Sequence, residues 1–144
     1  MDNWPQFSDA VVDYYFCKKL AYFFIRRSQQ PLCLMMDDKS GELVLYAVND
    51  HQHSCDLRYR VTDTDTGEVI VQACATAAAD ASTALHTIPD DGKAHFYAIE
   101  WDTQEGCFLN HYLHGQAPFD YEWYMKCLKK LRLDEFEGFE GENA

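Results

Sequence analysis

The chain has 144 residues and a mass of 16.7 kDa, the size of one domain; its 47% hydrophobic and 15% aromatic content excludes global disorder and collagen-like or linker classes. Twelve basic against 24 acidic residues give a net charge of -12, which argues against nucleic-acid binding and against an anionic membrane surface. No apolar run reaches the roughly 20 residues that a bilayer-spanning helix needs.

The first predicted element is a long helix from Asp9 to about Arg27. Ser8 is a suitable N-cap residue, and Ser28-Gln29-Gln30-Pro31 ends the helical pattern. Apolar and aromatic side chains surround most of this helix, and a helix of that kind is buried on more than one side. A small domain covers only one side, so we expect the helix to need a partner outside this chain. We also expect the isolated chain to self-associate.

From Pro31 the hydrophobic period changes from helical to two, with turn residues at short intervals. The sequence therefore predicts a mainly β fold class, an immunoglobulin-like β-sandwich of about seven strands over residues 31–116, although the immunoglobulin Cys–Trp–Cys signature is absent. The expected strands are Leu32–Met36, Glu42–Asn49, Leu57–Thr62, Val69–Ala75, Ala81–Ile88, His95–Asp102 and Cys107–Leu113.

A short second helix is predicted within residues 117–133, where Asp120 is a suitable N-cap residue and basic side chains gather at the C-terminal end. The tail, residues 134–144, has five acidic residues and no basic one, and we expect it to be disordered.

The six cysteines show no CxxC or zinc-knuckle spacing. The first five residues are neither basic nor apolar, so we expect no signal peptide there. Reduced thiols, mostly filling the core, are therefore expected, which suggests a cytoplasmic protein. Nothing in the sequence points to a cofactor or a bound metal.

Three groups of side chains have residue types that could form a chemical site. Glu100, Asp102 and Glu105 lie close in sequence, and glycosidases use two carboxylates about 5 to 9 Å apart. However, the first two share the outward face of a strand, which favours a solvated surface. His51, His53 and Cys55 are suitable zinc ligands, yet a fourth ligand is not visible and their segment has the composition of a surface loop. His111 and His114 point to opposite faces of a regular strand and cannot chelate together.

The tryptophans differ in their surroundings. Trp101 alternates with core positions, so it is expected in the core. Trp123 and Tyr124 are suited to stacking on a sugar, but packing of their helix on the sandwich explains them at least as well. Trp4 precedes every element of the sandwich, and nothing in the chain obviously buries it.

The two ends of the chain resemble glycoside hydrolase family two, in its β-mannosidase-like or β-galactosidase-like branch. Asp2-Asn3-Trp4-Pro5 is similar to the Asp-x-Trp-Pro motif of the last barrel strand, and Asp13-Tyr14-Tyr15 is similar to Asp-Tyr-Tyr in the helix that follows. Asn110-His111-Tyr112 and Pro118-Phe119-Asp120 look like the last strand and exit of the family's terminal sandwich.

The resemblance implies that residues 1–30 are the last strand and helix of a catalytic barrel and that the chain is the non-catalytic C-terminal part of the enzyme. The catalytic glutamates lie on earlier barrel strands, so no catalytic residue is assigned in this chain. Trp4 becomes a substrate-binding wall residue and Asp2 its support, both only with the parent barrel. The implied partners are that barrel and, through it, a carbohydrate. Two alternatives remain open, a carbohydrate-binding module and a free-standing protein-interaction domain.

Overall fold

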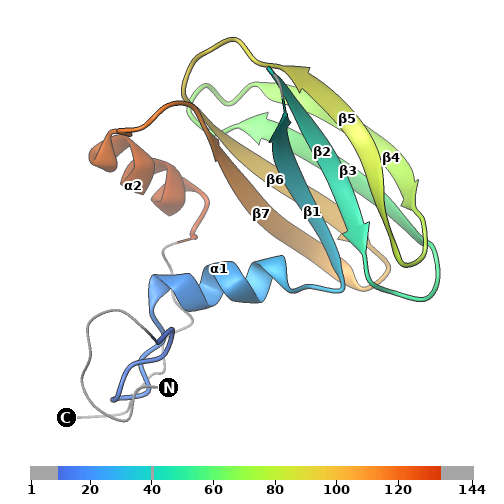
Figure 1. Ribbon diagram of the computed structural model, residues 1–144, viewed down its shortest axis with the longest axis horizontal. Helices are drawn as coiled ribbons and strands as arrows, with labels where there is room; N and C mark the ends of the chain where they lie inside the picture. Colours follow the sequence, from blue (N-terminus) through green and yellow to red (C-terminus); the bar gives the residue numbers. More distant parts are fainter. Residues whose placement is uncertain (1–9, 40, 134–144) are drawn as a thin grey trace.

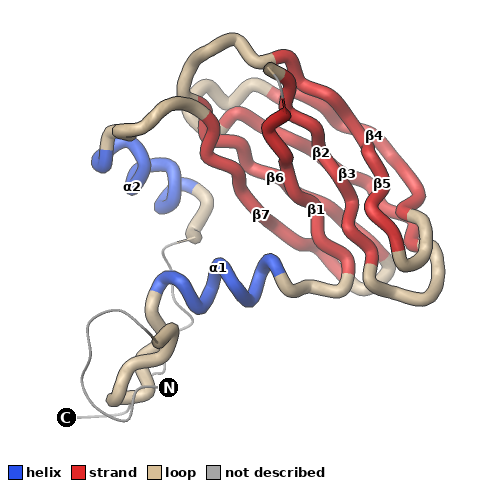
Figure 2. The backbone as a smooth tube through the Cα atoms, in the orientation of Figure 1, coloured by secondary structure: helices blue, strands red, loops and turns tan. Residues whose placement is uncertain are grey.

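The computed structural model describes residues 10–39 and 41–133 (Figure 1). Within these ranges seven antiparallel strands form two sheets of a sandwich, in the orders β1-β2-β5 and β4-β3-β6-β7. Both helices lie on one side of the sandwich (Figure 2). The predicted β-sandwich is thus confirmed. The elements are α1 (Leu20–Ser28), β1 (Leu32–Lys39), β2 (Glu42–Asn49), β3 (Cys55–Asp63), β4 (Val69–Ala77), β5 (Ala81–Pro89), β6 (His95–Thr103), β7 (Gly106–His114) and α2 (Tyr121–Lys130).

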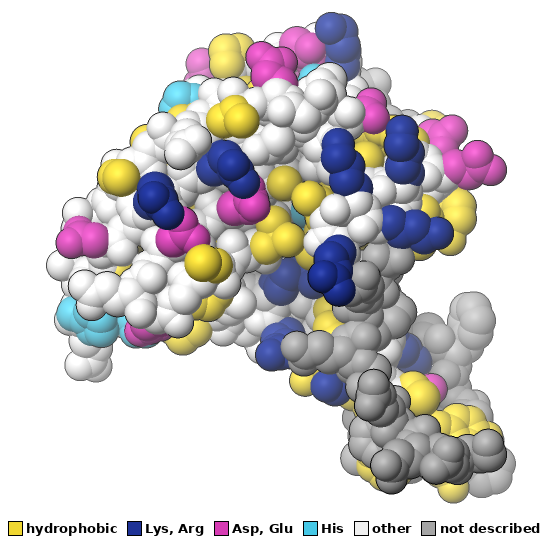
Figure 3. Space-filling view, turned by 180° about the vertical axis from the view of Figure 1, so that it is seen from behind, with side chains coloured by type: hydrophobic (Ala, Val, Ile, Leu, Met, Phe, Trp, Pro, Cys, Tyr) yellow, Lys and Arg dark blue, Asp and Glu magenta, His cyan; other side chains and the backbone are white. Residues whose placement is uncertain are grey.

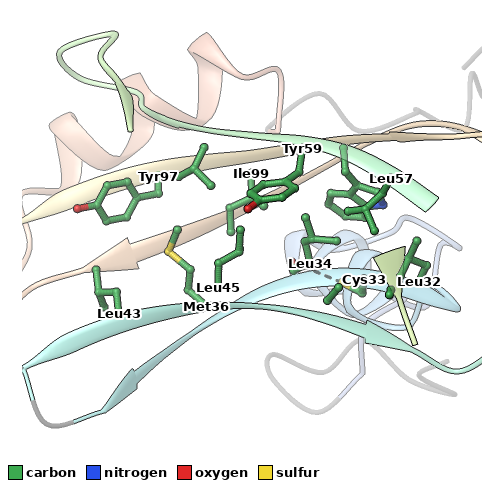
Figure 4. Packing of buried hydrophobic residues seen from close by; sticks show 14 of the residues in the cluster. Leu32, Cys33, Leu34, Met36, Leu43, Leu45, Leu57, Tyr59, Tyr97 and Ile99 are labelled. Atoms are coloured by element: carbon green, nitrogen blue, oxygen red, sulfur yellow. Dashed lines mark hydrogen bonds between the residues drawn. The ribbon is translucent and has the colours of Figure 1, made fainter. Parts of the chain in front are cut away.

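The period-two pattern of the sequence produces the main core between the two sheets. In β2, Leu43, Leu45 and Ala47 are fully buried and alternate with less buried neighbours, because successive side chains of a strand point to opposite faces. Leu57 and Ile99 approach them from the facing sheet (Figure 4). Burial of these apolar side chains is the main term that holds the sandwich together.

An aromatic contact within one sheet and a polar contact between the two sheets add to this core. Trp101 is only 1% exposed and stacks on Phe108 across the β6–β7 pair, with ring centroids 5.6 Å apart. The Asn110 side-chain amide of β7 donates to the Leu34 carbonyl of β1 at 3.0 Å, closing one side of the sandwich. The sequence prediction that Trp101 belongs to the core is therefore confirmed.

The long N-terminal helix predicted from Asp9 is wrong, because α1 begins only at Leu20. Asp13 accounts for the difference: its Oδ1 accepts hydrogen bonds from the backbone N–H groups of Tyr15 and Cys17, at 2.9 and 2.8 Å. A short polar side chain that satisfies backbone donors locally competes with the helix. Phe16 takes a positive φ of 65°, and residues 12 and 18 form an isolated β-bridge, so this segment is a closed turn.

The second helix matches its prediction. It packs on the outer face of the β6–β7 part of the four-stranded sheet and forms a second apolar cluster, in which Phe96 and Leu128 are fully buried. Other members from α2 are Cys127, Trp123, Tyr124, Met125 and, just after the helix, Leu131 and Leu133.

Removal of the α2 cap is expected to have a measurable but moderate effect. Asp120 accepts a hydrogen bond from the Trp123 backbone N–H at 2.8 Å, which satisfies one of the free donors at the helix start. Asp120→Ala is expected to lower the free energy of unfolding by about 1 kcal/mol, whereas Asp120→Ser, which keeps a cap, loses less. Urea denaturation followed by circular dichroism measures both. Equal losses for the two variants would contradict the capping role.

The cysteines differ from expectation in burial. All six lie in the described ranges and none forms a disulfide, as expected for reduced thiols. Only Cys33 and Cys127 are buried, whereas Cys17, Cys74 and Cys107 are exposed, so the expectation that most of them fill the core is wrong. Neither helix in the part of the chain that the structure describes has the length and apolar character needed to cross a membrane.

Candidate functional site

The two residues that the sequence assigns to a substrate pocket, Trp4 and Asp2, lie outside the described residues. The other candidates can be placed, and none of them forms a catalytic constellation.

The carboxylates of β6 lie on the outer face of the four-stranded sheet and are paired with arginines of β3. Arg58 contacts Asp102 at 2.8 Å, and Arg60 contacts Glu100 at 2.7 Å. Figure 3 shows positive and negative side chains next to one another on this side of the molecule. Hydrogen bonds from Cys107 and from Arg58 hold the pKa of Asp102 below its usual range, so it is not a proton donor near neutral pH.

The interpretation of this row as a solvated strand face is therefore supported. All four charged side chains keep more than two fifths of their surface exposed, and each is satisfied by its neighbour. A glycosidase needs one carboxyl group that stays protonated. Asp102 has surroundings that favour its charged form, and Glu100 is paired with Arg60. Glu105 lies apart from them in the turn between β6 and β7.

His51 and His53 lie in the β2–β3 loop with ring centroids 5.0 Å apart. The Cys55 thiol faces the Asn49 side-chain oxygen at 3.8 Å instead of the histidine rings. Over residues 10–39 and 41–133, no group of three or more His, Cys, Asp or Glu side chains is arranged to hold a metal ion. His51 and His53 thus lie in a surface loop, and Cys55 is the first residue of β3.

His111 and His114 point to opposite faces of β7, as their spacing predicts. His111 lies on the outer face, where its ring stacks on Phe96 with centroids 5.1 Å apart. His114 contacts Asp90 on the other face. Burial, with a smaller contribution from the charge of Arg27, lowers the pKa of His111 to about 4, so this ring is neutral at pH 7.

The buried neutral state of His111 predicts an acid-sensitive fold. In the unfolded chain a histidine takes up a proton near pH 6.5, whereas His111 in the folded chain takes it up near pH 4. Stability is therefore lost as pH falls from about 6.5 to 4, since the unfolded chain binds the proton first. We expect His111→Phe to flatten this part of the curve of unfolding midpoint against pH. His53→Gln, at an exposed loop position, is the control; a wild-type curve that is already flat there would contradict the prediction.

The aromatic residues of α2 are explained by packing. Trp123 and Tyr124 both contact Phe96, with centroid separations of 6.4 and 5.8 Å. Rings that pack on the sheet in this way are not free to stack on a sugar from solution. The structure therefore favours the packing interpretation of both residues over sugar binding.

Among residues 10–39 and 41–133, three consecutive exposed aromatic residues lie in the turn before α1. Tyr14, Tyr15 and Phe16, here called the aromatic turn, are 47%, 71% and 58% exposed. On the helix that follows, Ile25 is also exposed, at 43%. Side chains of this size on the surface of a domain mark an interaction site when they are contiguous in the chain. The sequence placed these residues on a helix and so missed that they project from one turn.

α1 itself is held to the sandwich by a small number of contacts. Phe24 lies against His111 with ring centroids 5.1 Å apart, and the Arg27 guanidinium lies 4.8 Å from the centre of the Phe24 ring. The Nε and Nη2 atoms of Arg27 are buried without a hydrogen-bond partner, so the ring face is the main contact of its charged end. The candidate docking surface therefore consists of the aromatic turn and the side of α1 that carries the exposed Ile25, here called the free side of α1.

The described residues define an immunoglobulin-like β-sandwich domain with two helices on one outer face. No family model and no curated protein matches the sequence. The structure is similar to part of a crystal structure of β-D-mannosidase from Dictyoglomus thermophilum, with a TM-score of 0.56 and 17% sequence identity. The match covers 74% of this chain and 14% of that chain, so this chain corresponds to a small part of the length of that enzyme. At this identity the likeness establishes the fold.

Proposed function

We propose that the chain is the non-catalytic C-terminal sandwich domain of a family-two glycoside hydrolase. The observation that carries the proposal is the fold likeness to one small part of a β-mannosidase chain. The sequence motifs Asp2-Asn3-Trp4-Pro5 and Asp13-Tyr14-Tyr15 support it, since they resemble those of the family's last barrel strand and helix, although Asp13-Tyr14-Tyr15 lies in the turn before α1 in this structure. The ion-paired carboxylates of β6 agree with a domain that has no catalytic centre of its own.

In this proposal the aromatic turn and the free side of α1 face the catalytic barrel. Burial of large apolar side chains against the barrel supplies the affinity, because exposed aromatic residues gain most when water is removed from them. Trp4 then forms part of the wall of the sugar pocket, and Asp2 supports it. The whole enzyme hydrolyses β-glycosides, β-mannosides in particular, by the retaining route with two carboxylates.

The test is co-expression of the chain with the polypeptide encoded directly upstream of it. We expect the chain alone not to hydrolyse a p-nitrophenyl β-mannoside, and the pair to co-purify and to hydrolyse it. A Trp4→Ala variant is then expected to raise KM for the glycoside without preventing co-purification. An upstream frame that encodes no barrel, or a pair that neither co-purifies nor reacts, would overturn the proposal.

The same experiment separates the two alternatives. A carbohydrate-binding module predicts that the isolated chain binds a glycan in calorimetry and loses the affinity when an exposed aromatic residue is removed. A free-standing interaction domain predicts a protein partner other than a glycosidase barrel. Either result, together with an inactive pair, would replace the enzyme-domain proposal.

A further inference from the structure

Three turns meet at one end of the sandwich, and two histidines lie between them. His95, the first residue of β6, contacts the carboxylate of Asp63 through Nδ1 at 2.6 Å and that of Asp91 through Nε2 at 2.9 Å. Asp63 ends β3 and opens the β3–β4 turn, and Asp91 belongs to the β5–β6 turn. The Asp63 side chain is only 4% exposed, so its charge is nearly shut off from water.

The second histidine extends the same arrangement. His114 lies directly opposite His95 in the β6–β7 register, and the two therefore occupy the same face of the sheet. The Nε2 atom of His114 lies 2.8 Å from a carboxylate oxygen of Asp90. Its Nδ1 atom lies 3.4 Å from a carboxylate oxygen of Asp38, near the end of β1, and makes no hydrogen bond. Two histidines thus lie among four aspartates, of which Asp90 and Asp91 belong to the β5–β6 turn, and Asp38 and Asp63 to the ends of β1 and β3.

The positions of the ring nitrogens of His95 set its protonation state. A neutral imidazole donates from one nitrogen and accepts at the other, whereas a carboxylate can only accept. Both nitrogens of His95 face carboxylates at hydrogen-bond distance, so both must carry a proton. We propose that His95 is a proton-dependent clasp, which as an imidazolium ties the β3–β4 turn to the β5–β6 turn and releases them when it loses a proton.

Other charged groups at this end agree with a positive ring at the centre. Lys93 lies 3.3 Å from the second oxygen of Asp91, so that carboxylate is shared between two cations. Tyr97 stacks on His95 with centroids 5.3 Å apart; burial and the charges of nearby aspartates raise its pKa to about 12, and it stays neutral. Within the described part of the chain no group of three or more His, Cys, Asp or Glu side chains is arranged to hold a metal ion.

The clasp also reaches α2. Asp63 Oδ1 accepts hydrogen bonds from the N–H groups of Asp65 and Thr66 and so shapes the β3–β4 turn. Lys130, at the end of α2, donates to the Thr64 carbonyl of this turn, and Thr64 donates to the Phe96 carbonyl beside His95. Loosening of the turn therefore acts on the contact that holds the C-terminal end of α2.

The pH range of the clasp follows from the two kinds of group. Burial alone lowers the pKa of His95, but its bonds to Asp63 and Asp91 outweigh burial and raise the pKa above its ordinary value. Stability from the ring is therefore complete below about pH 6.5 and is lost as pH rises through the raised pKa. The hydrogen bond from His95 is the main cause that lowers the pKa of Asp91 to about 2. The Asp91 carboxylate is therefore protonated, and its bond to His95 weakened, only in strong acid.

The first measurement is of the ring nitrogens in ¹⁵N-histidine-labelled protein between pH 5 and 10. We expect both nitrogens of His95 to remain protonated above pH 7, where an unperturbed histidine has lost its proton. Amide hydrogen exchange in residues 64–67 and 91–93 is expected to accelerate together as the His95 ring loses its proton. A His95 ring that loses its proton near pH 6.5, the ordinary value for histidine, or is a neutral tautomer at pH 6, would overturn the proposal.

The second measurement compares variants in thermal unfolding at pH 6 and pH 9. The wild-type equilibrium constant for unfolding is expected to rise by about tenfold for each unit by which the His95 pKa is raised, and His95→Gln to show no such rise. Asp63→Asn keeps the Oδ1 acceptor of the turn but removes the charge, and it is expected to reduce the pH dependence even if His95→Gln fails to fold. His53→Gln is the matched control. Stabilisation of the wild type by Zn²⁺, abolished in His95→Gln, would replace the proton with a metal and overturn the proposal.

Discussion

Replacement of Trp101 with alanine is expected to lower the free energy of unfolding by about 3–5 kcal/mol, the largest single effect in the sandwich. The side chain is 1% exposed, lies between the two sheets and stacks on Phe108. Its removal loses apolar burial and leaves a cavity that the paired strands β6 and β7 cannot collapse to fill. Guanidinium denaturation followed by far-UV circular dichroism measures the loss.

Tyr121→Ala is the matched control for Trp101→Ala. It also removes a large aromatic ring, but Tyr121 is 72% exposed, and the expected change is within about 0.5 kcal/mol. Trp101→Phe is expected to lie between the two, since it keeps a ring at the stacking position. A Trp101→Ala variant as stable as the control would mean that the two sheets do not pack as described.

Disruption of the aromatic turn is expected to weaken association of the chain at least tenfold. The double variant Tyr15→Ser with Phe16→Asn removes two exposed rings, each contributing about 1.5–3 kcal/mol when fully buried against a partner. Asparagine is chosen at Phe16 because it tolerates the positive φ found there. Sedimentation equilibrium of the isolated chain measures self-association, and co-purification with the upstream polypeptide measures the proposed docking.

Exposed apolar residues elsewhere provide the controls for this experiment. Val69→Ser on β4 and Tyr121→Ser on α2 remove comparable exposed surface away from the aromatic turn, and they are expected to leave the association constant unchanged. A wild-type mass that stays monomeric at every concentration would contradict the expected self-association. If all the variants weakened the association equally, the chain would associate through exposed apolar surface in general and not through the aromatic turn.

The strands could be predicted from the sequence because their signal is local. The alternation in Glu42–Asn49 predicts both ends of β2 correctly, and the remaining strands differ from their predictions by one to three residues at their ends. The largest difference is at the C-terminal end of β1, which continues through Asp37 and Asp38. Backbone hydrogen bonds to β2 hold these two residues in the strand, although their side chains are not hydrophobic.

The start of α1 could not be predicted because two local preferences compete. The apolar run favours a helix, but the Asp13 carboxylate takes up the backbone donors of Tyr15 and Cys17 and closes a turn. The predicted long helix that is apolar nearly all round is therefore not present, and it no longer supports a missing partner. The expectation of a missing partner now rests on exposed side chains in that turn.

The histidine clasp had no sequence signal, for a different reason. His95 and Asp63 are 32 residues apart, and only the antiparallel pairing of β3 with β6 brings them together. Asp91 shares a turn with His95, but Pro89-Asp90-Asp91-Gly92 has the composition of any tight turn. Sites that depend on the register of distant strands are visible only once that register is known.

The pairing of β3 with β6 also sets how the chain reaches its folded state. Three hairpins, β1–β2, β3–β4 and β6–β7, join neighbours in sequence, whereas Arg58 meets Asp102 across 44 positions. Closure of so long a loop costs chain entropy before its contacts form, so the hairpins are early and the central pair is late. Until β6 pairs with β3, the edge of β3 that faces away from β4 has unpaired backbone groups, and we expect the chain to be most prone to aggregate in this interval.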